Sequence, residues 1–170
     1  MLANTVGNFT NAAPFVGVHI MCHGATVFWL YADEFGRRPT LPEFTAPSMS
    51  PPDPIVKSML RYGKHLQNAA ALTSVAPGSV LVFVENNEPK HSCVALGGHR
   101  IGGYNQTGWF TTNGVPGGYS VHNMSEVIWL PGLMHRGLVR GSHDRMHCKL
   151  CAIPEGAAKA ALRQAVQLAV

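Results

Sequence analysis

Four cysteines and nine histidines are the residues of this 170-residue chain best suited to covalent and acid–base chemistry. A cysteine thiolate is a strong nucleophile, and an imidazole can accept its proton and later protonate a leaving amine. Cys22 is the first candidate nucleophile. It is expected at the start of a helix over residues 22–35, where free N–H groups and the helix dipole lower the pKa of a thiol. The alternative interpretation of Cys22 is an unreactive core thiol.

His91 is the candidate partner of this thiol, because it opens a strand predicted over residues 91–98 and can be held there against the start of a helix. A third side chain must orient the imidazole, and an amide or a carboxylate can do so. Asn105 is expected to lie opposite His91 in the next antiparallel strand, and an amide is favoured because the chain has only three aspartates. The alternatives for the third position are His99, Gln106 and Asp144.

A competing cluster of metal-ligand types lies in the segment GSHDRMHCKLC. Its members could bind zinc and are His143, His147, Cys148 and Cys151. The adjacent His147 and Cys148 would point to opposite sides of a strand, so we interpret the segment as an ordinary strand before the last helix. The glycines around residues 97–103 match neither a P-loop nor a dinucleotide-binding motif. The sequence therefore predicts neither a metal nor a cofactor.

The elements that must position these residues follow from the pattern of apolar residues, Gly and Pro. Helix 22–35 is apolar on most sides, which predicts a buried central helix ending at Gly36. Six prolines in residues 39–54 predict an irregular surface loop. The other expected elements are a helix over 55–72, strands at 79–85, 91–98, 99–110, 118–130 and 147–153, and a helix after Pro154. The predicted fold is α+β, with N-terminal helices packed on a central antiparallel sheet and a C-terminal helix, in one domain over residues 1–170.

Composition excludes several classes of protein. Only 13% of residues are charged and 46% are hydrophobic, which argues against a coiled coil and a disordered chain. The net charge of +4 is scattered, so no nucleic-acid partner is expected. No apolar segment is long enough to span a membrane, and the N-terminus lacks the pattern of a signal peptide. We expect synthesis in a reducing cytoplasm, without disulfides.

Three segments resemble a known family, the NlpC-type bacterial cell-wall peptidases and amidases within the papain-like cysteine hydrolases. IMCHGATVFWLYADEFGRRPTLP is similar to the family's helix with its Cys-Ser-Gly start, while APGSVLVFV and KHSCVALGG are similar to its strand pair with the catalytic histidine. The segments follow the family's order over residues 20–110. The chain departs from the pattern at Met21 and His23, which flank Cys22, and at Ser92 and Cys93, which follow His91.

The resemblance implies a papain-like fold and a cysteine hydrolase of amide bonds, with Cys22 as nucleophile, His91 as base and acid, and Asn105 as the orienting residue. The Cys22 N–H would bind the oxyanion, with His19 or His23 as candidate helpers. The implied substrate is a peptidoglycan peptide. A small chain without a leader suits an antibacterial effector similar to type VI secretion amidases, exported to a target periplasm and neutralised in the producer by a cognate immunity protein. The alternatives are a virulence effector that cleaves or deamidates a host protein, and an inactive binding module with the same fold.

Overall fold

The structure is a computed structural model that describes residues 1–10, 20–106, 108–115, 118–143 and 145–168. Its helices are α1 (Leu2–Asn8), α2 (Cys22–Phe35), α3 (Leu41–Thr45), α4 (Asp53–Met59), α5 (Ala69–Thr73) and α6 (Glu155–Gln167). Short 3₁₀ turns lie at Leu60–Tyr62, Met124–Glu126 and Leu133–His135. Its strands are β1 (Lys64–Leu66), β2 (Val80–Glu85), β3 (Glu88–Leu96), β4 (Arg100–Gly103), β5 (Ser120–Asn123), β6 (Leu138–Arg140) and β7 (His147–Ile153).

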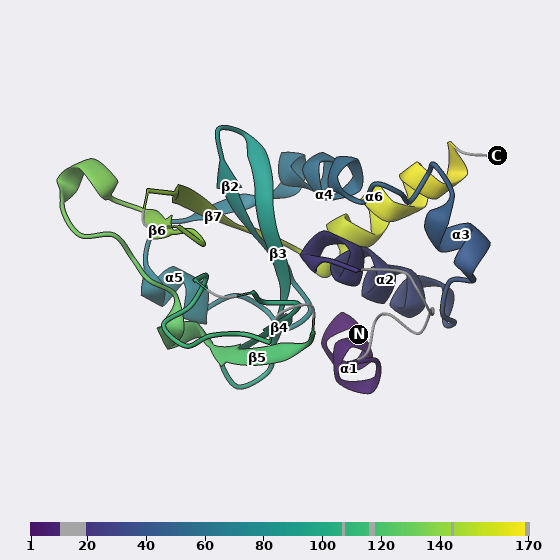
Figure 1. Cartoon of the computed structure of the whole chain (residues 1–170), viewed down its shortest axis with the longest axis horizontal. Helices are drawn as coiled ribbons and strands as arrows, with labels where there is room; N and C mark the ends of the chain where they lie inside the picture. Colours follow the sequence, from purple (N-terminus) through teal and green to yellow (C-terminus); the bar gives the residue numbers. More distant parts are fainter. Residues whose placement is uncertain (11–19, 107, 116–117, 144, 169–170) are drawn as a thin grey trace.

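Within the described residues, the strands form one antiparallel sheet in the order β1-β7-β2-β3-β4-β5, with β6 also paired to β7. Strands β2 to β5 follow the chain as a meander, whereas β7 inserts between β1 and β2. In Figure 1, helices α1, α2, α3, α4 and α6 gather to the right of the sheet, and α5 is drawn below β6 and β7. The fold is therefore α+β with an antiparallel sheet and a C-terminal helix, as the sequence predicts. None of the described helices is long and apolar enough to cross a membrane.

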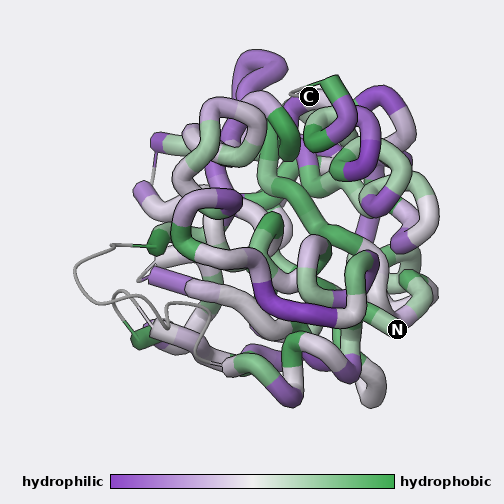
Figure 2. The backbone as a smooth tube through the Cα atoms, turned by 90° about the vertical axis from the view of Figure 1, so that its right-hand side faces the viewer, coloured by the Kyte–Doolittle hydropathy of each residue, from purple (hydrophilic) through white to green (hydrophobic). Residues whose placement is uncertain are grey.

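Alternation along the strands divides the buried side chains into two clusters, one on each face of the sheet. Val82 and Val94 pack with α2, whereas Phe83 and Cys93 face the opposite cluster. Figure 2 shows a hydrophobic stretch crossing the middle of the molecule, with most hydrophilic stretches toward its outside. Helix α2 is buried from His23 to Ala32 and ends at Gly36 in the left-handed conformation (φ 67°), so the predicted central helix is confirmed.

The prediction of an irregular loop over residues 39–54 is wrong in part, because this segment contains α3 and the first turn of α4. Thr40 and Glu43 form a reciprocal capping box at the start of α3. The prolines in the first turns of these helices are compatible with helical structure, since first-turn N–H groups have no partner inside the helix.

The prediction of one helix over residues 55–72 is also wrong. Helix α4 ends at Met59, a 3₁₀ turn follows, and the chain turns at Gly63 into β1, which pairs with β7 at the sheet edge. A Cβ atom at Gly63 would lie 3.2 Å from the Leu60 oxygen and 3.4 Å from Cys151 Cβ. Close packing against β7 therefore overrides the helical spacing of the apolar residues.

Smaller differences concern short elements. Helix α1 and strand β6 have no counterpart among the predicted elements, and α5 keeps only the end of the helix expected over 55–72. The strands expected over 99–110 and 118–130 are regular only in β4 and β5. Two isolated bridges lie outside the regular ladders: Phe110 pairs with Val127, and Trp129 pairs with Val139. Short elements carry too few residues for a periodic pattern, and pairing across the sheet decides their structure.

Asp33 joins three helices and yields a prediction about stability. It accepts a hydrogen bond from Thr5 of α1 and pairs with Lys159 of α6. Burial tends to raise the pKa of this carboxyl, but its contacts with Lys159 and Thr5 lower the pKa to about 2. The folded-state pKa lies below the unfolded one, so the stabilisation is complete above pH 4 and is lost as the pH falls toward 2.

We expect Asp33→Asn to reduce the free energy of unfolding at pH 7 by about 2 kcal/mol, measured by urea denaturation. The deficit should shrink as the pH falls from 4 to 2. The matched control is Asp53→Asn, because the Asp53 side chain is 60% exposed. A deficit that stays constant from pH 7 to pH 2 would contradict the assigned role of the Asp33 charge.

Candidate active site

Cys22 is the first residue of α2 and is partly exposed. The N-cap residue is Met21, whose side chain makes no capping hydrogen bond within the described residues. The positive end of the helix dipole and the N–H groups of the first turn therefore surround the thiol. This environment favours a thiolate, and it can also bind negative charge on an oxygen that forms next to the sulfur.

His91 and Asn105 meet as the sequence predicts. Val94 pairs with Gly102 in the β3–β4 ladder, and continuing this register by three residues places Asn105 opposite His91. His91 Nε2 lies 2.8 Å from Asn105 Oδ1, and both side chains are buried. The His91 ring also stacks on Trp109, with ring centroids 4.7 Å apart.

The hydrogen-bond pattern fixes which nitrogen of His91 faces the thiol. The Ser120 carbonyl accepts a hydrogen bond from Asn105 Nδ2 at 3.2 Å, so the amide oxygen is the group that faces the imidazole. His91 Nε2 must then carry a hydrogen and donate it to Asn105 Oδ1. Since His91 also hydrogen-bonds to Cys22, its Nδ1 is left to exchange a proton with the thiol.

His23 is a second imidazole in contact with Cys22. Its side chain is buried, and its Nε2 lies 3.3 Å from the Pro89 carbonyl, which can only accept a hydrogen bond. Its Nδ1 lies 2.8 Å from Ser92 Oγ, which lies 3.0 Å from Thr26 Oγ1. Nε2 is therefore a donor, and Nδ1 can donate to the Ser92 hydroxyl or accept from it, according to the charge of the ring.

The two imidazoles acidify the thiol. Burial tends to raise the pKa of Cys22, but hydrogen bonds from His23 and then His91, together with their charges, lower it from 9.0 to about 5. Burial tends to lower the pKa of His23, but Cys22 and Asp53 raise it above its usual value. Burial raises the pKa of Cys93, Cys148 and Cys151. Of the four free cysteines, Cys22 alone has an acidic thiol.

The other sequence candidates have different positions. His99 lies in the β3–β4 turn, on the exposed surface, with φ 56°. Gln106 is exposed and borders a cavity beside Cys22 without an observed bond to His91 among the described contacts. Asp144 and His19 lie outside the described residues. The sequence places His23 directly after Cys22, which is a signal that the two side chains could interact. The orientation of the His23 ring depends on the packing of α2 against Ser92 and Pro89, which the sequence does not show.

Two cavities border Cys22. The larger cavity, of about 520 Å³, lies between the start of α2, residues 44–53 and Pro89, and His23 borders it. The smaller cavity, of about 160 Å³, also borders the thiol and is lined by His91 and Trp109 among others. Met21, Cys22 and Lys90 border both cavities. The proline-rich segment is thus a wall of the larger cavity.

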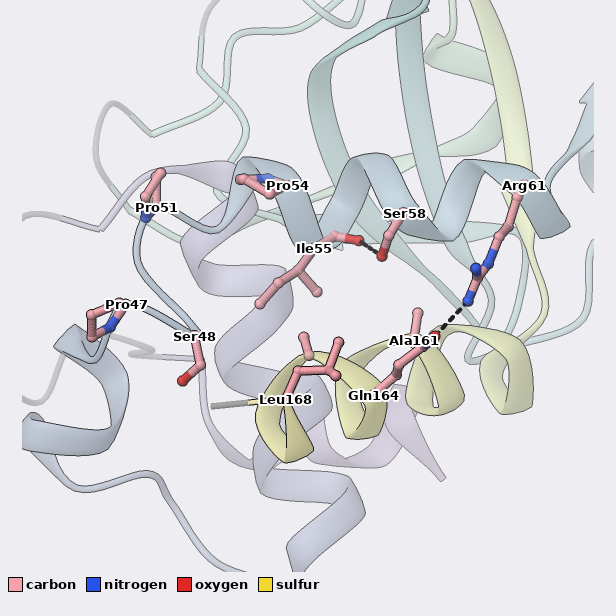
Figure 3. A pocket seen from close by; sticks show the side chains of 11 residues that line it. Pro47, Ser48, Pro51, Pro54, Ile55, Ser58, Arg61, Ala161, Gln164 and Leu168 are labelled. Carbon is pink, nitrogen blue, oxygen red and sulfur yellow. Dashed lines mark hydrogen bonds between the residues drawn. The ribbon is translucent and has the colours of Figure 1, made fainter. Parts of the chain in front are cut away.

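A separate cavity of about 310 Å³ lies between α4, α6 and three prolines of the segment 47–54 (Figure 3). Arg61 donates a hydrogen bond to Gln164 across one end of it (Figure 3). Its described lining residues include no cysteine or histidine, so it offers no nucleophile or imidazole base.

The segment 143–151 does not gather its metal-ligand types in the structure. Cys148 belongs to the cluster on one face of the sheet, whereas Cys151 packs against the cluster on the other face. Among the described residues, no group of three or more His, Cys, Asp and Glu side chains is close enough to hold a metal ion. Asp144, which belongs to the same segment, lies outside the described residues.

Comparisons with known proteins found no matching protein-family model, no matching curated protein and no matching solved structure. The resemblance of residues 20–110 to NlpC-type peptidases therefore stays a prediction.

Proposed function

We propose that the protein is a cysteine hydrolase that cleaves an amide bond through a thioester on Cys22. The observation that carries the proposal is the contact between an acidic thiol at a helix start and His91, which is itself oriented by Asn105. The nucleophile on a buried helix and the histidine on a central strand also favour a papain-like, NlpC-type fold.

In the proposed reaction, His91 takes the proton of the Cys22 thiol, and Cys22 Sγ attacks the carbonyl carbon and forms a C–S bond. The N–H groups at the start of α2 stabilise the negative oxygen. The C–N bond then breaks, and the nitrogen takes a proton from His91 and leaves as an amine. A water molecule next gives a proton to His91 and attacks the thioester. The C–S bond breaks, which releases a carboxylic acid and restores the Cys22 thiolate.

His23 has a different role from His91 in this proposal. Pro89 and Ser92 hold its ring in place beside the sulfur, so in this proposal it supplies positive charge to the thiolate while His91 carries the proton. His91 keeps one nitrogen for proton transfer because Asn105 engages only the other. The site thus separates ionisation of the thiol from acid–base catalysis.

This division of roles predicts a pH effect for His23→Gln. Glutamine can keep hydrogen bonds to Ser92 and Pro89 but lacks the charge, so the pKa of Cys22 should rise well above its value of about 5. At pH 6 the thiolate fraction, and with it the alkylation rate with iodoacetamide, should fall about tenfold. The rate should be lost below about pH 5 in the wild type and already at a higher pH in the variant.

The measurement is the pH dependence of Cys22 alkylation by intact-protein and peptide mass spectrometry, from pH 4 to pH 9. The matched control is His147→Gln, which changes an exposed histidine on β7. An unchanged pH midpoint in His23→Gln would show that its charge does not ionise the thiol.

The proposed substrate is a peptidoglycan peptide, and the proposed setting is an antibacterial effector that needs an immunity protein in its producer. Purified muropeptides incubated with the protein should each gain one water per cleaved amide, read by mass spectrometry. Muropeptides left intact by a protein whose Cys22 is rapidly alkylated at pH 6 would exclude the cell-wall substrate. Cleavage or deamidation of host proteins would then be the next test.

A further inference from the structure

We infer that His122, together with Glu126, is a positioning residue that determines which nitrogen of His91 carries a hydrogen. This inference rests on the proposed function and adds to it a further imidazole that does not touch the substrate. His122 is not among the described residues that line the two cavities beside Cys22, so its effect must pass through other side chains.

His122 is a buried imidazole on β5 that the proposed reaction does not use. Its side chain is 3% exposed, and its ring stacks on Phe110 with the two centroids 4.3 Å apart. A polar ring in such a place needs partners for its nitrogens, because an unpaired buried polar group is destabilising. The partners of the two nitrogens therefore show what the ring holds in place.

Thr112 and Glu126 fix one side of the His122 ring. Its Nδ1 lies 3.1 Å from Thr112 Oγ1 and 3.4 Å from Glu126 Oε1. Burial tends to raise the pKa of Glu126, but hydrogen bonds from Thr112 and the Asn123 N–H lower it below its usual value. The Thr112 hydroxyl gives its single hydrogen to this carboxylate, so its oxygen can only accept from the ring. His122 Nδ1 therefore carries a hydrogen, and Nε2 is left for another partner.

That partner is Ser120. Ser120 and His122 are two residues apart on β5, so their side chains lie on the same face of the sheet. Ser120 Oγ lies 3.2 Å from His122 Nε2, and the Ser120 carbonyl accepts the hydrogen bond from Asn105 Nδ2. Because Ser120 is the first residue of β5, where a ladder tends to fray, its contact with His122 adds a second restraint on its position.

The position of Ser120 decides how the Asn105 amide is turned. Gly103 pairs with Ser120, and a Cβ atom at Gly103 would lie 2.9 Å from Asn105 Oδ1, so the amide lies close against β4. If the amide turned over, its NH₂ group would face His91 Nε2, which would then have to accept. The hydrogen of a neutral His91 would move to Nδ1, the nitrogen that must take the proton of Cys22. The Ser120 carbonyl opposes this, because it accepts only from the NH₂ group.

Aromatic stacking joins the two imidazoles by a second route. Phe110, which stacks on His122, directly follows Trp109, which stacks on His91. A change in the His122 ring can therefore reach His91 through packing as well as through hydrogen bonds. The hydrogen-bonded route runs through Glu126, His122, Ser120, Asn105, His91 and Cys22.

The experiment reads the hydrogen of His91 directly and needs no substrate. Long-range ¹H–¹⁵N spectra of the full chain distinguish the two neutral forms of an imidazole, and His91→Ala identifies the His91 signals by their loss. The spectra are recorded in a Cys22→Ser background, which has no thiolate to hold a second proton on the ring, at about pH 8.5, where an ordinary histidine is neutral. With His122 intact, we expect the hydrogen on His91 Nε2.

Two variants of His122 separate orientation from packing. The longer side chain in His122→Gln reaches the place of Nε2 and can still bond to Ser120, whereas the shorter one in His122→Asn reaches only toward Thr112 and Glu126. We expect the hydrogen to stay on Nε2 of His91 in His122→Gln and to be shared between both nitrogens in His122→Asn. Ser120→Ala, which removes only the hydroxyl, should act like His122→Asn and replaces it if that variant does not fold.

Activity gives the second measurement. His122→Asn should lower kcat for muropeptide cleavage about tenfold at unchanged KM, and His122→Gln should recover most of this loss. The matched control is Val139→Ala, which removes buried atoms on β6 and takes part in none of these hydrogen bonds. It should leave the His91 spectrum unchanged.

The outcomes separate this inference from the proposed function. A hydrogen that stays on His91 Nε2 in His122→Asn and Ser120→Ala would overturn the inference. Equal changes in His122→Gln and His122→Asn, or a change of the same size in Val139→Ala, would also overturn it, because lost packing would then explain the effect. Muropeptides left intact by the wild type would count against the proposed substrate, while the spectra would still decide the role of His122.

Discussion

Replacing Cys22 with serine is expected to lower kcat/KM for amide cleavage by at least about 10⁴-fold. The serine hydroxyl keeps the size of the thiol, but it remains protonated next to His23 and His91 at neutral pH. The α2 dipole and the two imidazoles would then act on a group that they cannot ionise. Product formation from muropeptides by wild type and Cys22→Ser, followed by mass spectrometry, measures the effect.

A double variant tests whether Cys22 and His91 act as one unit. His91→Ala alone should cause a loss of similar size, and Cys22→Ser/His91→Ala should be no worse than either single variant. The matched control is Cys151→Ser, because Cys151 is half-buried on β7 and its thiol has a raised pKa. Activity that survives in Cys22→Ser but is lost in Cys151→Ser would place the nucleophile elsewhere.

Asn105→Ala is expected to lower kcat by about 100-fold, with a smaller effect on KM, because the variant removes the acceptor that holds His91 Nε2. Without the amide oxygen, the ring can turn and present either nitrogen to the thiol. The substitution also leaves the Ser120 carbonyl without its Asn105 donor, which costs about 1–3 kcal/mol of stability.

The conservative variant separates orientation from stability. Asn105→Asp restores an acceptor for His91 and should recover much of kcat, although it cannot donate to Ser120. Urea denaturation of both variants shows whether they are equally destabilised. Equal kcat values in Asn105→Ala and Asn105→Asp, at equal stability, would contradict an orienting role for Asn105.

The site could be predicted from the sequence only where neighbouring strands or a single helix decide the geometry. Cys22 could be placed at a helix start because Gly36 and the apolar residues define α2 on their own. Asn105 could be placed opposite His91 because a short hairpin fixes the register of β3 and β4. The roles of these residues in catalysis stay predictions.

The remaining features depend on contacts between distant segments. The ring of His23 reaches Ser92 and Pro89 only because α2 packs on β3. Ser142 and Met146 border the smaller cavity beside Cys22, and their position depends on the β6–β7 turn reaching residue 108. The break after Met59 reflects the pairing of β1 with β7, which overrides a good helical pattern. No local pattern carries this information.

The short turn between β3 and β4 has a consequence for how the chain can change. Leu96 pairs with Arg100, so three residues set the alignment that brings Asn105 to His91. Inserting or deleting one residue there would shift the returning strand and turn the amide toward the opposite face of the sheet. Loop length at residues 97–99 is thus as tightly constrained as the identity of the residues that meet Cys22, although no side chain of this turn reaches the thiol in the described structure.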